Sequence, residues 1–127
     1  MNKRKSILLK VLFITVVSFF FVAIFSVFSP VPIVPEEKAI VETAVVTNIY
    51  EGGIKDVVFI CENHPRKFYI NRGLENGLNL TTLKEQLIGQ EVTFKYPKYW
   101  TPLDWNDEFK HVSKVELDGV IVFNELK

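Results

Sequence analysis

A long run of apolar residues near the N-terminus is the strongest pattern in the chain. Residues 11–29 contain no Asp, Glu, Lys or Arg. As a helix, this run would extend about 28 Å at ~1.5 Å per residue, close to the ~30 Å hydrocarbon core of a bilayer. It is longer than the apolar region of a secretory signal peptide, and no small-x-small cleavage site follows it. The sequence therefore predicts an uncleaved signal-anchor, a single-pass transmembrane helix over residues 11–29.

Beyond residue 38, apolar and polar residues alternate in the manner of β-strands. The pattern predicts strands over residues 39–50, 57–61, 67–71, 91–96 and 112–117. The Asp118-Gly119 pair is suited to a two-residue hairpin turn that leads into residues 120–123. The alternation is imperfect in residues 39–50, as is expected of a long curved strand.

One helix is predicted between the third and fourth strands. Leu80, Leu83 and Leu87 recur at helical spacing, and Gly89 is placed to end the helix. The candidate N-caps are Asn79, Thr81 and Thr82, the last of them in a capping box with Glu85.

Three strands, a helix and two strands is the element order of the oligonucleotide/oligosaccharide-binding (OB) barrel. We therefore predict an N-terminal transmembrane helix followed by a mainly-β domain, an OB-like five-stranded barrel with one helix between strands 3 and 4. Element order alone leaves an alternative open, which is a small open α+β sheet with one packed helix.

Composition divides the chain into four parts. Residues 1–10 form a basic N-terminus, residues 11–29 the transmembrane helix, residues 30–38 a proline-rich linker, and residues 39–127 the OB-like domain. Three prolines within six residues favour an extended polyproline II conformation in the linker, which would make it a semi-rigid spacer.

Charge is distributed unevenly, although the formal net charge of the whole chain is +0. Four of the 15 basic residues precede the apolar run, so 11 basic and 15 acidic residues follow it, a net charge of −4. Basic residues that flank a span stay on the cytoplasmic side. We expect a cell-membrane protein with its N-terminus in the cytoplasm and its C-terminal domain outside. An acidic domain in that place also disfavours a nucleic-acid partner.

The segment KYWTPLDWNDEFK, residues 98–110, is the main candidate for a binding site, and we call it the aromatic loop. It contains Tyr99, Trp100, Trp105 and Phe109. In an OB barrel, the loop between strands four and five helps to frame the ligand face. Exposed Trp and Tyr dominate interface hot spots, so these four residues are the candidate contacts for a membrane or envelope protein, a peptide or a glycan. In the alternative interpretation, which the usual burial of large aromatics favours, the Trp rings fold back as a lid over the barrel end.

Motifs that would specify an enzyme are missing from the sequence. There is no nucleophile elbow, glycine-rich phosphate loop or zinc helix motif, and Cys61 with His64 makes half a metal site at most. We therefore predict a non-enzymatic binding or scaffolding module with no catalytic residue, cofactor or metal. The alternative is a small accessory hydrolase or metal-dependent enzyme that uses the acidic residues of the aromatic loop, namely Asp104, Asp107 and Glu108, together with His111.

Two segments carry a resemblance to known proteins. FYINRGLENGL, residues 68–78, followed by the helix and by WTPLD, residues 100–104, resembles a pattern in small bacterial single-pass membrane-anchored proteins with an OB-like outer domain. The resemblance covers most of the outer domain and implies this architecture, but it implies no particular activity.

Overall fold

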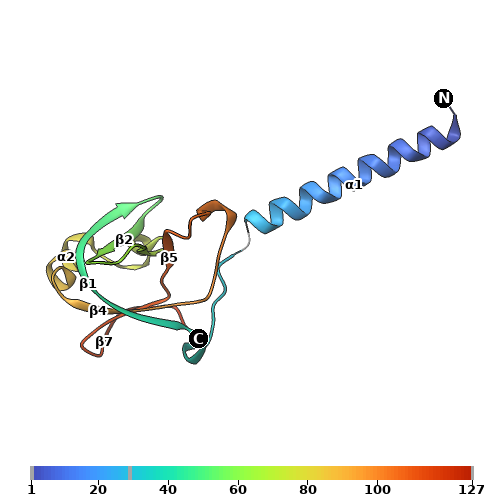
Figure 1. Ribbon diagram of the computed structural model, residues 1–127. Coiled ribbons are helices and arrows are strands. Elements are labelled where there is room, and N and C mark those ends of the chain that lie inside the picture. Colours follow the sequence, from blue (N-terminus) through green and yellow to red (C-terminus); the bar gives the residue numbers. More distant parts are fainter. Residues whose placement is uncertain (1, 29, 127) are drawn as a thin grey trace. The chain divides into compact units, whose positions relative to one another are not determined.

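The computed structural model describes residues 2–28 and 30–126 of the 127-residue chain. The chain divides into two compact units, one that contains the long helix α1 and one that is a β domain (Figure 1). Helix α1 spans Lys3–Val27 and is long and apolar enough to cross a membrane, by length and composition. Of the predicted boundaries, Met1, Ser29 and Lys127 lie outside the described residues.

Helix α1 begins earlier than the predicted span because the basic residues that precede the apolar run are also good helix formers. Asn2 caps this start, since its side-chain oxygen accepts a hydrogen bond from the Arg4 N–H at 3.3 Å. Apolarity thus predicts the membrane-length core of the helix, whereas backbone hydrogen bonding sets its actual start.

The β domain is built on one seven-stranded sheet with the order β5-β3-β2-β1-β4-β6-β7. The strands are β1 Ile40–Gly52, β2 Asp56–Cys61, β3 Lys67–Ile70, β4 Glu91–Tyr96, β5 Phe109–His111, β6 Lys114–Leu117 and β7 Val120–Asn124. The other elements are helix α2, Leu80–Leu87, and the short 3-10 helices η1 Glu36–Lys38, η2 Gly73–Asn76 and η3 Pro102–Asp104. The predicted class, a mainly-β domain with one packed helix, is confirmed, but the predicted number of five strands is wrong.

The strand count differs because β5 precedes the predicted strand over residues 112–117, which corresponds to β6. β5 begins at Phe109, within the aromatic loop, and pairs in parallel with β3, whereas β6 pairs antiparallel with β4. Val112 and Ser113 form the bend between them: Val112 N–H donates to the Tyr69 carbonyl and Ser113 N–H to the Lys95 carbonyl, both at 2.8 Å. The bent segment, residues 109–117, therefore pairs with both β3 and β4, which are not neighbours in the sheet order.

The remaining strand is the second arm of the predicted terminal hairpin, which is confirmed. β6 and β7 pair across Asp118 and Gly119. The φ angles of these residues are 51° and 79°, and a two-residue type I′ turn needs positive values at both positions.

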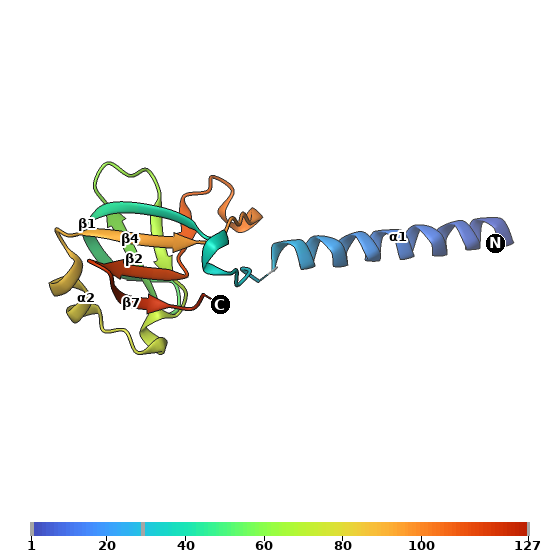
Figure 2. The same cartoon turned by 90° about the horizontal axis from the view of Figure 1, so that it is seen from below.

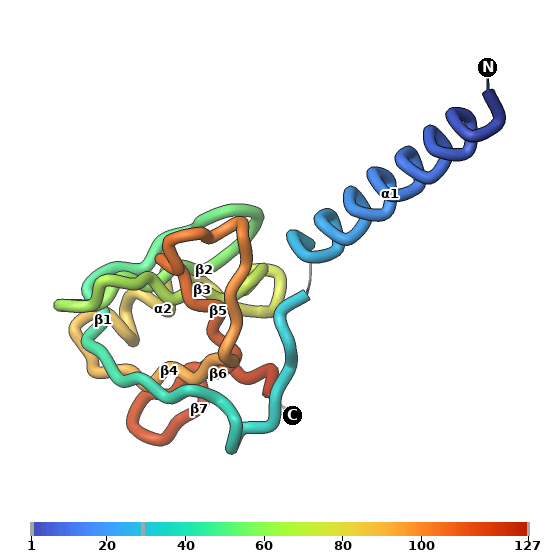
Figure 3. Tube along the Cα trace, turned by 45° about the vertical axis from the view of Figure 1, so that its right-hand side comes forward, coloured from blue at the N-terminus to red at the C-terminus, as the bar shows by residue number. Residues whose placement is uncertain are grey.

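Strand β1 connects the two parts of the sheet. Its residues 40–45 pair with β4 and its residues 46–52 with β2, with a register shift between Val46 and Asn48. This irregularity explains the imperfect alternation in the sequence. Figure 2 shows the curved β1 beside β4, and in Figure 3 β2 and β3 lie on one side of the domain and β4, β6 and β7 on the other.

Aromatic rings fill the core between the two parts of the sheet. Phe68 stacks on Phe94 with ring centroids 4.3 Å apart, and Phe59 meets Phe94 edge-on at 5.4 Å. Helix α2 adds Leu83 and Leu87 to this core. Asn79 caps α2 by accepting a hydrogen bond from the Thr82 N–H at 3.0 Å, which selects it from the three predicted caps.

Candidate functional site

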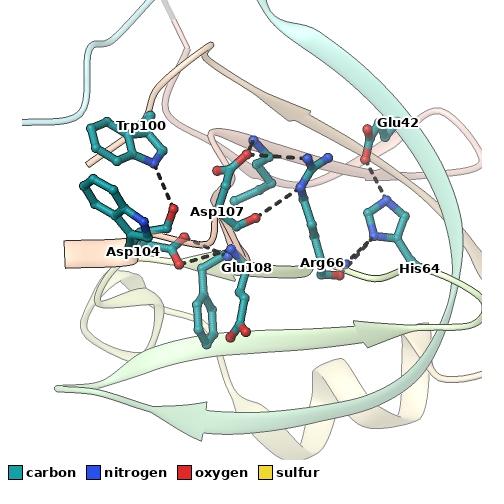
Figure 4. Close-up of polar contacts among 10 residues, drawn as sticks. Glu42, His64, Arg66, Trp100, Asp104, Asp107 and Glu108 are labelled. Atoms are coloured by element: carbon teal, nitrogen blue, oxygen red, sulfur yellow. Dashed lines mark hydrogen bonds and ion pairs between the residues drawn. The ribbon is translucent and has the colours of Figure 1, made fainter. Parts of the chain in front are cut away.

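Asp104 fixes the shape of the aromatic loop from within. Its two carboxylate oxygens accept hydrogen bonds from the backbone N–H groups of Glu108, at 3.1 Å, and Phe109, at 2.9 Å (Figure 4). The Asp104 carbonyl also accepts the N–H of Asp107 at 3.0 Å. One side chain therefore closes the turn that returns the loop to β5.

Asp107 joins the loop to the turn between β2 and β3. Its carboxylate accepts a hydrogen bond from Lys110 Nζ at 2.7 Å and lies 3.6 Å from the Arg66 guanidinium. Arg66 Nε also donates to the Asp107 carbonyl at 3.1 Å. Because the backbone and the side chain of Asp107 are both bound, the base of the loop is fixed to a neighbouring turn.

The two tryptophans lie together on the surface of this loop. The side chains of Trp100 and Trp105 are 49% and 74% exposed, and their rings meet at 66° with centroids 5.4 Å apart. Trp100 Nε1 donates to the Trp105 carbonyl at 3.4 Å. The rings are therefore not a lid over the core. The physical reason is that Phe59, Phe68 and Phe94 already fill the interior.

The other two predicted contacts are placed differently. Phe109 belongs to β5, where it packs edge-on against Tyr69 with centroids 6.2 Å apart and lies under Lys67 Nζ at 5.4 Å. Tyr99 is half-buried beside Trp100 in the sequence. The structure therefore brings Trp100 and Trp105 together and leaves Phe109 in the sheet.

A half-buried polar cluster behind the loop is a feature that the sequence did not predict. His64 Nε2 lies 2.9 Å from Glu42 Oε2, and His64 Nδ1 accepts the N–H of Arg66 at 3.1 Å (Figure 4). Burial and a hydrogen bond with the same Glu42 raise the pKa of Tyr96 above its ordinary value. The cluster continues through Arg66 to the aromatic loop. The sequence carries no signal for it, because Glu42 occupies an ordinary polar position of a strand.

Three of the four side chains named for an enzymatic site, those of Asp104, Asp107 and His111, are bound to other groups. Besides the contacts of Asp104 and Asp107, His111 Nε2 lies 2.9 Å from Glu125 Oε1, and the His111 side chain is 10% exposed. Burial, followed by the negative charge of Glu42, raises the pKa of Cys61 to about 11. Among residues 2–28 and 30–126, no three His, Cys, Asp or Glu side chains are grouped to hold a metal ion. The carboxylates of Asp104 and Asp107 thus serve the structure of the loop.

A second charged cluster, which we call the linker clamp, fixes the end of the proline-rich linker. Glu36 Oε1 accepts hydrogen bonds from Lys95 Nζ at 2.7 Å and Lys114 Nζ at 2.6 Å, and Lys114 also lies 2.8 Å from Glu116. The bonds from the two lysines lower the pKa of Glu36 to about 2. Lys95 and Lys114 are opposite each other on neighbouring strands, so a counter-charge between them is needed.

Comparison with known proteins adds no assignment: no family model matches the chain, and no curated protein or solved structure is significantly similar to it.

Proposed function

We propose that this protein is a single-pass membrane-anchored binding module, which presents its β domain outside the cytoplasm and recognises a partner through Trp100 and Trp105. The observation that carries this proposal is the exposed tryptophan pair on a loop that is held in one shape. Large aromatics are usually buried, and exposed Trp is the residue most enriched in binding hot spots. A monomer gains no stability from leaving both rings in water.

The rigidity of the loop supports a binding role. Asp104 and Asp107 together receive hydrogen bonds from two backbone N–H groups and from Lys110. Part of the conformational entropy that a flexible loop would lose on binding is therefore already lost in the free protein. Such preorganisation lets the contact area of the two indoles contribute more fully to affinity.

The sheet supports a finer proposal about the fold, namely that it is an OB-like barrel. The bent segment of residues 109–117 pairs in parallel with β3 and antiparallel with β4. An OB fold is a five-stranded, partly open barrel in which the loop between strands four and five helps to frame the ligand face. The aromatic loop is the loop in that position.

The orientation is proposed from the basic residues at the start of α1, which favour a cytoplasmic N-terminus. A reporter enzyme that is active only outside the cytoplasm, fused after Lys127, should be active, while the protein keeps its full length and resists alkaline extraction. Activity of only a cytoplasmic reporter in the same position would refute the orientation.

The binding role can be tested by photocrosslinking in intact cells. A photoreactive phenylalanine analogue that replaces Trp105 should give a discrete adduct. Ile54 is the matched control position, because it is 70% exposed and lies between β1 and β2. The same analogue at Ile54 should give no such adduct. Equal crosslinking at both positions, or none at Trp105, would refute recognition by the loop.

A further inference from the structure

The partner of the aromatic loop can be inferred from where the loop leaves the β domain. We propose that Trp100 and Trp105 insert into the headgroup interface of the same bilayer in which α1 is anchored. This inference rests on the proposed function and names the partner class, a phospholipid surface. The protein would then have a second, interfacial membrane contact besides its span.

The linker and the loop leave the β domain at the same edge. Ile40, the first residue of β1, pairs with Tyr96, the last residue of β4. The linker ends two residues before Ile40, and the aromatic loop begins two residues after Tyr96. The linker clamp strengthens this neighbourhood, since Glu36 is bound to Lys95 at 2.7 Å. The part of the β domain closest along the chain to the anchor is therefore the part that carries the tryptophans.

The clamp also limits how far this edge can move from the bilayer. Only residues 29–35 lie between α1 with its cap and the clamped η1 in the sequence. As polyproline II, seven residues would extend about 22 Å. From Tyr96, the four further residues to Trp100 can extend at most ~14 Å. The headgroup layer adds ~5–7 Å on each side of the hydrocarbon core. The distance that the loop can extend from Tyr96 is thus comparable with the length of the linker between α1 and η1.

The chemistry of the loop surface fits a lipid interface. Tryptophan is enriched at the headgroup level of membranes, where one part of the ring meets lipid and the other meets water. Trp100 and Trp105 meet at 66°, so the pair offers no single flat face for a sugar ring to stack on. The carboxylates of Asp104 and Asp107 are occupied by N–H groups and cations, which reduces their repulsion from lipid phosphates.

Tryptophan fluorescence tests the inference directly, because Trp100 and Trp105 are the two tryptophans of the chain. The full-length protein is placed in nanodiscs of phosphatidylcholine, with both bilayer faces open to solvent. One sample has ordinary acyl chains and the other has chains brominated near the headgroup. We expect blue-shifted emission that iodide does not quench, and loss of most of this emission in the brominated lipid.

The control moves the reporter to the opposite end of β1. In a variant with Trp100→Phe, Trp105→Phe and Ile54→Trp, the emission should be quenched by iodide and unaffected by bromine. If iodide quenches both indoles in phosphatidylcholine but not in membranes of the native host, the lipid contact is overturned and the proposed function stands. If iodide quenches them in both membranes, the lipid contact and recognition by the loop are overturned together.

Discussion

Replacing Asp104 with alanine tests whether one carboxylate sets the shape of the aromatic loop. In the wild-type protein, this side chain accepts the N–H groups of Glu108 at 3.1 Å and Phe109 at 2.9 Å. Asp104→Ala removes both acceptors and leaves the rest of the loop sequence unchanged. The expected consequence is local opening of the loop at its junction with β5, with the sheet intact.

The size of the effect follows from the exposure of the two bonds. A hydrogen bond to a charged group contributes about 1.5–3 kcal/mol, and an ordinary one about 0.5–1.5 kcal/mol. Water can replace part of what is lost here, because the bond to Glu108 is exposed and the bond to Phe109 is part-buried. We take about 1 kcal/mol for each bond. The resulting ~2 kcal/mol corresponds to a ~30-fold rise in the open population of the loop.

Amide hydrogen exchange of the full-length protein measures this population. In Asp104→Ala, the amides of Glu108 and Phe109 should exchange ~30-fold faster, and amides in the buried strand β2 should keep their rates. Asp104→Asn retains one acceptor oxygen and should give a smaller effect. Glu108→Ala is the matched control, because it removes a neighbouring exposed carboxylate. Unchanged exchange in Asp104→Ala, or equal acceleration in Glu108→Ala, would refute this account of the loop.

Three further predictions concern the core, the linker clamp and the cysteine. Phe68→Ala should lower the free energy of unfolding by about 3–5 kcal/mol in denaturant titration, because Phe68 is fully buried against Phe94, whereas Ile54→Ala should change it by less than about 0.5 kcal/mol. The pKa of Glu36 is lowered from 4.5 to about 2, so the clamp should contribute its full stability above pH 4.5 and lose it as the pH falls from 4.5 towards 2. The Glu36→Gln variant should therefore lack this loss of stability when its unfolding is measured as the pH falls from 4.5 towards 2. A variant whose stability falls with pH as that of the wild type does would contradict the role of the clamp. Burial raises the pKa of Cys61 to about 11, so a thiol reagent at neutral pH should label it at the rate of unfolding, and labelling within the mixing time would show an accessible thiol.

The elements that the sequence predicted well have strong local signals. Leucine spacing predicted α2, with Asn79 as one of three candidate caps, and Asp118-Gly119 predicted the terminal hairpin, because both signals lie within a few residues. α1 begins at Lys3, before the predicted span, because hydropathy locates a span, whereas Asn2 and the basic residues determine where the helix begins.

The features that the sequence did not predict depend on long-range pairing. The bend at Val112 and Ser113 places Ser113 and Lys114 among buried residues, so the segment has no apolar alternation that would show two strands. The parallel pairing of β3 with β5 and the linker clamp both join residues that are distant in sequence. The aromatic loop was found from its composition, but the exposure of Trp100 and Trp105 depends on a core that Phe59, Phe68 and Phe94 already fill.

The two pairings of β1 have a consequence for the order in which the domain is assembled during synthesis. Residues 46–52 meet β2 across a short turn, whereas Thr43 meets Thr93, which is made 50 residues later. Nearby strands pair first, because closing a short loop loses less entropy. Until β4 and the bent segment have been made, residues 40–45 and the outer side of β3 remain open edges, which can pair with other chains. The newly made protein is therefore most exposed to aggregation after β3 has been made and before the bent segment closes the sheet.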